Sequence, residues 1–453
     1  MAETKKNHDQ REAEMTNSTQ ARSMTPFLIV WSGQAVSLLG SQLVQFALIW
    51  WLAQTTDSAT VLATAALVGM LPQIVFGPLV GALVDRWNRR VIMIVADSVI
   101  ALATVGLALL FWTDVVQVWH VYLLMFVRST AGGFHWPAMR ASTSLMVPKE
   151  HLTRVQGFNQ TLQGALTIAA APLGALLLDL LPMQGVLAID VGTALLAIAP
   201  LFFIAIPQPQ RRESSEAAKS SVGQDLREGL RYVWSWPGLV MILLMATIIN
   251  LVLNPAFALL PILVTKHFGG SALQLGWLES VWGVGVVLGG VTLGVWGGFR
   301  RRVLTSLVGL IGMGTSIWLI GMAPASAFPL AVGAIFCAGV MNPIVNGPLM
   351  AVLQAAVIPE MQGRVFTLTS SVAMAMSPLG LLIAGPVADT LGVRTWFIVG
   401  GVVTALMGAV GFMIPAVVYI EDNRGQPDMS KGVALGAAVD SRAKEEIAAG
   451  AAD

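Results

Sequence analysis

Residues 27–52 read FLIVWSGQAVSLLGSQLVQFALIWWL and contain no acidic or basic side chain. About 20 apolar residues in a helix are enough to cross the roughly 30 Å of hydrocarbon in a bilayer, so this run predicts a transmembrane helix. The whole chain of 453 residues is 55% hydrophobic and only 11% charged. Soluble domains carry about 25% charged residues, so we expect most of this chain to lie in a membrane.

Similar runs recur along the whole chain. Alternating segments of about ten residues, which are typical of an outer-membrane barrel, are absent from the sequence. The sequence therefore predicts an all-α membrane protein of about twelve transmembrane helices. The eleven further runs lie at 59–84, 91–112, 118–140, 155–179, 184–206, 238–264, 273–297, 303–323, 328–356, 364–389 and 395–420.

Basic residues predict the orientation of these spans. If the N-terminus is cytoplasmic, 23 of the 26 Lys and Arg residues fall in cytoplasmic segments, Lys266 and Arg394 fall outside, and Arg128 lies within a span. Cytoplasmic loops are enriched in Lys and Arg. We therefore expect both termini in the cytoplasm and a multi-pass protein of the inner (plasma) membrane. The first 22 residues are polar, without the apolar core of a cleavable signal peptide.

The spans fall into two groups of six separated by a polar stretch. We expect a cytoplasmic tail at 1–25, a six-helix bundle at 26–206, a cytoplasmic linker at 207–237, a second six-helix bundle at 238–420 and a cytoplasmic tail at 421–453. Within the linker, an apolar face is formed by Leu226, Leu230, Val233 and Trp234. This pattern fits either an amphipathic helix on the membrane surface or a solvated linker helix.

The two halves resemble copies of one another. Pro148, Arg154 and the Pro-Leu-Gly at 172–174 recur as Pro359, Arg364 and the Pro-Leu-Gly at 378–380, at offsets of 206 to 211 residues. Equal phase in the two halves predicts a parallel repeat about an axis along the membrane normal.

The loop after the second span contains a specific motif. It reads Gly-Ala-Leu-Val-Asp-Arg-Trp-Asn-Arg-Arg from Gly81 to Arg90. The motif resembles the signature of the major facilitator superfamily, with Asn88 in place of the usual turn glycine. Because Asn tolerates positive φ, we expect the turn to be kept. The resemblance implies a cytoplasmic gate formed by Gly81, Asp85, Arg86, Arg89 and Arg90, although simple topology-setting charge is the alternative reading.

Finer features match one branch of that superfamily. Arg128 with two glycines resembles the family's buried-arginine motif, and the Ala-Pro-Leu-Gly-Ala at 171–175 resembles a degraded antiporter motif. The Gly-Trp-Leu-Glu at 276–279 resembles the macrolide-efflux and enterobactin-exporter branch of drug:proton antiporters. The resemblance covers about residues 25–420 and implies a proton-coupled transporter.

Polar side chains form stripes at helical spacing on the first, fourth, seventh and tenth spans, which line the central cavity in facilitator folds. Polar groups facing lipid are unfavourable, so we expect these to face a cavity, with structural hydrogen bonding between helices as the alternative. The predicted cavity residues are Gln34, Ser37, Ser41, Gln45, His135, Trp136, Asn250, Asn254, Asn342 and Asn346.

Charged side chains inside the spans are the candidates for proton coupling. Arg128 lies near mid-span, where charge is costly, and it should have an acidic partner among Asp97, Asp190 and Glu279. Glu279 is flanked by Trp277 and Trp282, and an apolar setting of this kind suits a carboxyl that takes up and releases a proton.

We therefore expect a monomeric secondary transporter that exports amphipathic or lipophilic small molecules, such as macrolide-type drugs, by alternating access with protons. The alternatives are a siderophore or lipid exporter on the same fold, or a membrane receptor or assembly factor that does not transport. The sequence has no phosphate-binding glycine loop and no His/Cys metal spacing, so we expect no enzyme activity, cofactor or metal. The net charge of +1 gives no reason to expect nucleic acid.

Overall fold

A computed structural model describes residues 24–206, 208, 230–357 and 359–422. Its long helices are all of 21 residues or more. They are α2 (Thr25–Thr56), α3 (Ala59–Arg86), α4 (Arg89–Trp112), α5 (Val118–Met146), α6 (Leu152–Leu180), α7 (Met183–Phe203), α9 (Pro237–Ala258), α11 (Ala272–Trp296), α12 (Arg302–Met322), α13 (Phe328–Ala356), α14 (Pro359–Leu391) and α15 (Val393–Met413). The predicted all-α membrane fold is therefore confirmed.

Eleven of these helices are long and apolar enough to cross a membrane. Helix α5 does not meet that test, although it has 29 residues. The reason lies in its sequence, because Arg128, His135 and Arg140 interrupt its apolar residues. It nevertheless packs between α3 and α4, and neighbouring helices shield Arg128 and His135, whereas Arg140 is exposed.

Two predicted spans contain a membrane-length helix that ends before the predicted boundary. The run at 238–264 becomes α9, the single turn α10 (Leu260–Ile262) and the π-helical turn η2 (Leu263–His267), because Pro261 has no N–H to donate to the preceding turn. The run at 395–420 likewise ends its long helix at Met413, before Pro415 begins the short α16 (Pro415–Val418). Two 3-10 turns, η1 (Lys149–His151) and η3 (Ile420–Asp422), complete the elements.

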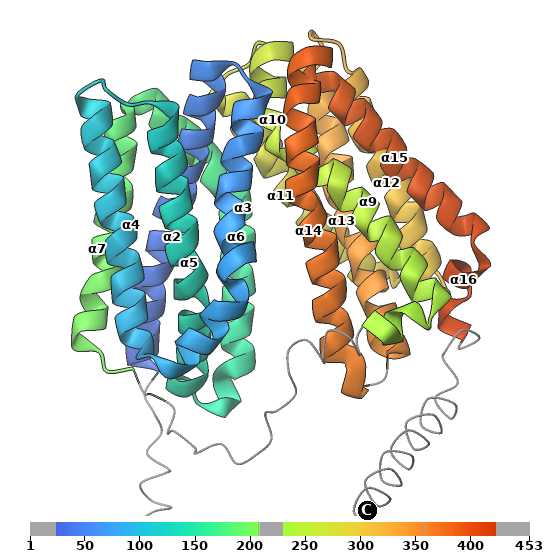
Figure 1. Cartoon of the computed structure of the whole chain (residues 1–453), viewed down its shortest axis with the longest axis horizontal. Helices are drawn as coiled ribbons and strands as arrows, with labels where there is room; N and C mark the ends of the chain where they lie inside the picture. The colour runs from blue at the N-terminus through green and yellow to red at the C-terminus, as the bar shows by residue number, and fades with distance from the viewer. Residues whose placement is uncertain (1–23, 207, 209–229, 358, 423–453) are drawn as a thin grey trace, which may run out of the picture.

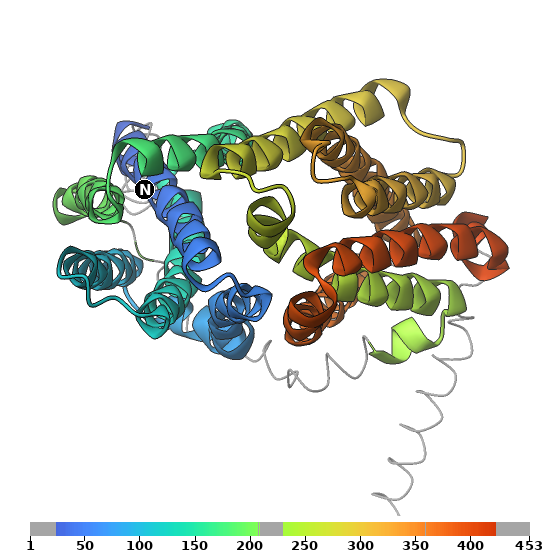
Figure 2. The same ribbon diagram turned by 90° about the horizontal axis from the view of Figure 1, so that it is seen from above.

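The long helices form two groups, α2–α7 and α9–α15, which lie side by side (Figures 1 and 2). The groups touch along two seams, one between α6 and α11 and the other between α3 and α14. A large buried apolar cluster runs through both groups. A second apolar cluster, centred on Phe27, Val84 and Met93, belongs to α2–α7 alone.

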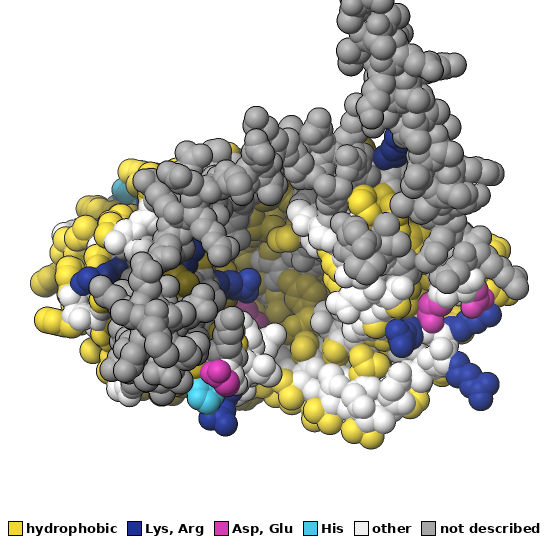
Figure 3. Space-filling model, turned by 90° about the horizontal axis from the view of Figure 1, so that it is seen from below, with side chains coloured by type: hydrophobic (Ala, Val, Ile, Leu, Met, Phe, Trp, Pro, Cys, Tyr) yellow, Lys and Arg dark blue, Asp and Glu magenta, His cyan; other side chains and the backbone are white. Residues whose placement is uncertain are grey.

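The molecule is closed on the upper face of Figure 1 and hollowed on the lower face. The upper ends of the two groups approach one another, whereas their lower ends are apart (Figure 1). Figure 3, viewed from below, shows a hollow between the groups that is floored by hydrophobic side chains. The N-terminal end of α2 and both ends of the chain segment joining the groups lie on this lower side (Figure 1).

Most of the predicted linker and both predicted tails lie outside the described residues. Of the proposed linker helix, residues 230–234 are described and are helical. Within them Val233 is buried, whereas Trp234 is 67% exposed. An exposed Trp234 is compatible with both a membrane-surface helix and a solvated linker helix, so the linker helix stays a prediction.

Candidate functional site

The first group of helices encloses a buried ion pair. Nη1 of Arg128 on α5 lies 2.5 Å from Oδ2 of Asp190 on α7, and the two side chains are only 10% and 1% exposed. Thr104 of α4 donates to the same carboxylate at 3.3 Å, and Ser41 of α2 donates to its other oxygen at 3.2 Å. Among the three predicted acidic partners of Arg128, the structure selects Asp190.

A second polar group lies in the same bundle. Asp97 of α4 is buried and accepts a hydrogen bond of 3.0 Å from Nε2 of Gln34 on α2. Nε2 of His135 on α5 lies 3.4 Å from the other carboxylate oxygen of Asp97, but this nitrogen makes no hydrogen bond to any described residue. Asp97, Gln34 and His135 thus come together from three helices.

Gln34 and His135 border a cavity of about 290 Å³ within the first group. Its wall includes Trp136, and the guanidinium carbon of Arg140 lies 4.9 Å from that ring. Opposite them, Nε1 of Trp31 donates to Asn159 at 2.8 Å. The other polar wall residues are Gln34, His135, Thr143, Gln156, Gln160 and Gln163.

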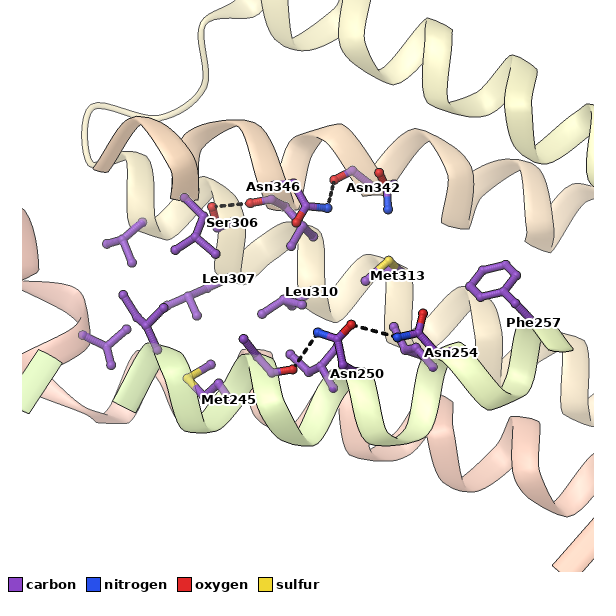
Figure 4. A pocket seen from close by; sticks show the side chains of 18 of the residues that line it. Met245, Asn250, Asn254, Phe257, Ser306, Leu307, Leu310, Met313, Asn342 and Asn346 are labelled. Atoms are coloured by element: carbon purple, nitrogen blue, oxygen red, sulfur yellow. Dashed lines mark hydrogen bonds between the residues drawn. The ribbon is translucent and has the colours of Figure 1, made fainter. Parts of the chain in front are cut away.

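A cavity of about 380 Å³ lies in the second group of helices and brings together all four predicted asparagines (Figure 4). Asn254 donates to Asn250 at 2.9 Å and to Ser377 of α14 at 2.6 Å. Asn346 donates to the backbone oxygen of Asn342 at 3.0 Å. The side-chain amide of Asn342 bonds to no described residue and is available to a ligand. The remaining wall is mostly apolar and includes Met245, Leu253, Phe257, Trp282, Leu310 and Met313.

A chamber of about 310 Å³ lies between the two groups. It shares Phe257 and Trp282 with the asparagine cavity, so the two spaces adjoin. Glu279, the eighth residue of α11, faces this chamber together with Gln45 of α2. Glu279 has neither a hydrogen bond nor an ion pair with any residue that the structure describes.

The remaining wall residues of this chamber come from both groups and are predominantly apolar. They are Gln42, Phe46, Ile49, Leu166, Thr167, Ala170, Ala171, Phe257, Leu260, Trp282 and Ile335. Arg128 and Asp190 pair elsewhere, so Glu279 is an isolated carboxyl rather than part of their network.

The loop motif is only partly described, because the surroundings of Gly81 and the side chains of Asp85 and Arg86 lie outside what the structure describes. Arg89 donates to Ala141 O at 2.9 Å, more than one turn before the end of α5. Arg90 donates to Leu201 O and to Phe202 O, at the end of α7. Helix C-terminal carbonyls attract cations, which favours the contact of Arg90 with the end of α7. The two arginines together join the start of α4 to α5 and α7 within the first group.

The expected positive-φ turn at Asn88 is wrong. Its φ is −66°, and its side chain caps α4 by accepting from Arg90 N at 3.0 Å. Asparagine is among the most favoured N-cap residues. In the matching loop of the second half, Gly297 and Gly298 do have positive φ, of 76° and 81°.

Two of the predicted cavity serines lie inside the first group of helices. Ser41 bonds to Asp190 and Ser37 is buried, and neither lines one of the three cavities above. Sequence reasoning missed Thr104, Ser377 and Asp389. Thr104 and Ser377 are polar residues within spans, but they do not belong to a stripe. Asp389 lies at the end of a span and is indistinguishable there from a solvated residue.

The described residues contain no group of three or more His, Cys, Asp or Glu side chains placed to hold a metal ion. The polar groups instead line spaces of a size suited to organic ligands, which occupy mostly apolar pockets with a few fixed polar contacts.

Solved transporters share this arrangement of helices. The structure matches the nucleoside transporter NupG with a TM-score of 0.64 at 12% identity, covering 84% of this chain and 98% of NupG. It also matches an inward-facing, unoccupied bacterial homologue of the human lysosomal transporter Spinster, with a TM-score of 0.62 at 14% identity, covering 87% and 97% of the two chains.

Sequence comparison gives closer relatives. Macrolide efflux protein A of Streptococcus pyogenes is 35% identical over 388 residues, which are 86% of this chain and 95% of the relative. The multidrug efflux pump Tap of Mycolicibacterium fortuitum is 27% identical over 88% of this chain and 97% of its own. These relatives confirm the predicted branch of efflux transporters.

The family profile described as Major Facilitator Superfamily matches residues 30–380 and, in a second match, residues 251–439. With its helical fold and the cavities between its helices, the chain belongs to the Major Facilitator Superfamily, a family of transporters rather than enzymes, and is related within it to macrolide and multidrug efflux pumps.

Proposed function

We propose that this protein exports amphipathic or lipophilic small molecules of the macrolide type across the plasma membrane, using the inward flow of protons. The asparagine cavity supports this substrate class. It offers several neutral amides, two methionines and aromatic side chains, with no charged residue in its wall. Adaptable apolar walls of this kind suit bulky, mostly uncharged ligands.

The orientation that we propose places the lower face of Figure 1 in the cytoplasm, as the distribution of basic residues predicts. The hollow on that face would then admit substrate from the cytoplasm (Figure 3). Rocking of the two groups about the site would close this face and open the upper one. The loop residues Gly81, Asp85, Arg86, Arg89 and Arg90 would form the cytoplasmic gate in the closed state.

The observation that carries proton coupling is the position of Glu279. Its carboxyl lies between the two groups, beside the proposed substrate cavity, and no described residue pairs with it. An isolated charge inside a membrane protein is costly and marks proton or ion pathways. A carboxyl that loads a proton when open to one face and releases it at the other would couple the two flows.

Asp97, Asp190 and Arg128 are the other proposed coupling residues. Their surroundings differ in how freely each residue could exchange a proton. Asp190 and Arg128 neutralise one another, whereas Asp97 lies 3.4 Å from His135, which lines a cavity. We propose that the protein works as a monomer, because both groups of helices and the chamber between them come from a single chain.

Inverted membrane vesicles test the proposed function. We expect uptake of a radiolabelled macrolide into vesicles that contain the protein when their interior is made acidic, and loss of uptake when a protonophore collapses the gradient. Uptake of a siderophore or a lipid instead of the macrolide would show that the protein is a siderophore or lipid exporter rather than a macrolide exporter. No gradient-dependent flux of any of these compounds would favour a receptor or assembly role.

A further inference from the structure

The end of α14 is hydrogen-bonded to the start of α3 at the closed upper face. Oδ1 of Asp389 accepts from Ala59 N at 2.7 Å. Oδ2 accepts from Thr60 N at 3.0 Å, from Thr60 Oγ1 at 2.6 Å and from Ser58 Oγ at 3.0 Å. One carboxylate of the second group of helices therefore receives four hydrogen bonds from a single helix end of the first group.

The physical basis of this contact is helix capping between the two groups. The first N–H groups of a helix lack partners inside the helix, and they lie at its positive end. Ser58 caps α3 from its own chain segment by accepting from Val61 N at 3.4 Å, but it leaves the preceding N–H groups unpaired. Asp389 supplies these partners together with a negative charge, and hydrogen bonds to a charged group are stronger than neutral ones.

Two neighbouring contacts hold the same seam. A Cβ atom at Gly385, one turn before Asp389, would lie 2.7 Å from Thr60 Cα and 3.1 Å from Ala63 Cβ, so only glycine permits this approach of the helices. Nearby, Lys266 of the second group lies 3.4 Å from Asp57 of the first. The seam thus combines close backbone packing with charged contacts at the surface.

The other seam, between α6 and α11, is built differently. Gly276 packs against the backbone of α6, and Gly283 packs mainly against the side chains of Thr167 and Ile168. Ser280 donates to Ile168 O. No ion pair crosses this seam among the described residues. Ser280 gives it one hydrogen bond between neutral groups, whereas the α3–α14 seam has four hydrogen bonds to one carboxylate.

The exposure of Asp389 makes its contact reversible. Asp389 and Thr60 are hydrogen-bonded at exposed positions, so water can solvate the carboxylate and the helix end as soon as they part. Arg128 and Asp190, by contrast, are enclosed within one group, and separation would leave both charges without water. A contact that breaks and re-forms between the groups requires a water-accessible position such as that of Asp389.

We propose that Asp389 is a positioning residue of the transport cycle, which holds the upper face closed by capping α3 while the lower face is open, and releases α3 when the upper face opens. The inference rests on the alternating access proposed above. Asp389 contacts no cavity in this structure and acts only through α3.

Cysteine accessibility tests the inference without measuring transport. The single native cysteine is first replaced by Cys337→Ser. A reporter cysteine, Gln42→Cys, is then placed in the wall of the chamber below the closed face, and a membrane-impermeant maleimide is applied from the side opposite to the N-terminus. We expect slow labelling in this background and labelling several-fold faster when Asp389→Asn is added.

A second reporter measures the other face. Gln160→Cys lies in the wall of the cavity of the first group, and we expect its labelling from the N-terminal side to slow when Asp389→Asn is present. Asp389→Glu, which keeps the charge, should restore part of the parent behaviour at both reporters. As a matched control, Asp422→Asn removes an exposed aspartate that pairs with Arg301 inside the second group, and it should change neither rate.

Equal labelling rates in the Asp389→Asn protein and its parent, with both proteins monodisperse in detergent, would overturn the inference. An increase with Asp422→Asn equal to that with Asp389→Asn would also overturn it, because the effect would then be one of general charge. If Asp389→Asn changes the labelling rates in a protein that shows no proton-driven export, the proposed role of Asp389 would be supported and only the proposed function would be contradicted.

Discussion

Arg128 on α5 and Asp190 on α7 form a direct ion pair inside the first group of helices, with Ser41 of α2 and Thr104 of α4 bonded to the same carboxylate. One carboxylate thereby joins four helices of a single group. Any rearrangement that separates the two groups as rigid bodies leaves this network unchanged. The pair therefore belongs to the framework of the first group, whereas Asp389 belongs to the contact between groups.

Arg128→Ala should destabilise the protein. Removal of one member of a buried pair leaves an uncompensated charge, which costs about 3–5 kcal/mol of the free energy of unfolding. We expect a clearly lower thermal transition temperature in detergent. The control is Arg301→Ala, which breaks the exposed pair with Asp422 and should cost at most about 1 kcal/mol.

The double variant with Asp190→Asn sharpens this prediction. Loss of both charges removes the unpaired carboxylate, so the double variant should be more stable than Arg128→Ala alone. An Arg128→Ala protein as heat-stable as its parent would show that Arg128 faces cavity water rather than a tight partner.

The sequence predicted the helices well because apolar length is a local property. The predicted ends were less accurate where a few residues interrupt a helix, as at Pro261 and Pro415. The sequence also identified Arg128 as a buried cation with three candidate partners. It did not select Asp190 among them, because helical periodicity defines a face of one helix and leaves open which neighbour that face meets. The role of Asp389 depends on a contact with residues about 330 positions away, which no local pattern contains.

Two glycines, one at the packed contact between α12 and α15 and one on α11, should respond differently to replacement by alanine. A Cβ atom at Gly314 would clash with the backbone of Gly401 and Ala405. Gly314→Ala should therefore force the helices apart and cost about 1–3 kcal/mol in stability. At Gly290 of α11 a Cβ atom meets nothing within 4 Å, so Gly290→Ala should be neutral or stabilise the helix by up to about 1 kcal/mol. Thermal unfolding of both variants measures these effects. A higher transition temperature for Gly314→Ala than for Gly290→Ala would contradict the close contact of α12 and α15 at Gly314.

The asparagine cavity predicts a ligand contact at Asn342, whose side-chain amide bonds to no residue that the structure describes. A hydrogen bond contributes about 1 kcal/mol net, or about fivefold in Kd. Asn342→Ala should therefore weaken equilibrium binding of a radiolabelled macrolide by about that factor. Gln354→Ala removes an amide from the same helix, away from the cavity wall, and should leave binding unchanged. Equal losses in both variants would place the ligand elsewhere.

Glu279→Gln tests the proposed proton carrier. The glutamine keeps the shape of the side chain and one hydrogen-bonding face, but it cannot release a proton. Because Glu279 faces the chamber beside the asparagine cavity, the variant should still bind substrate while losing uphill export driven by a pH gradient. Exchange of substrate across a membrane at equal pH should continue, since exchange requires only that the loaded carrier reorients.

A competing role for Glu279 is direct contact with a cationic substrate, since a carboxylate beside the aromatic rings of Phe257 and Trp282 could attract a cation. In that case Glu279→Gln would lose binding of cationic ligands and keep proton-driven export of neutral ones. Both kinds of ligand can be measured in one vesicle preparation, with Gln45→Ala as a control that alters the same chamber without removing a carboxyl. Proton-driven export of a neutral substrate at the parent rate by Glu279→Gln would exclude Glu279 as the proton carrier, because no other change in the variant could supply the missing titratable group.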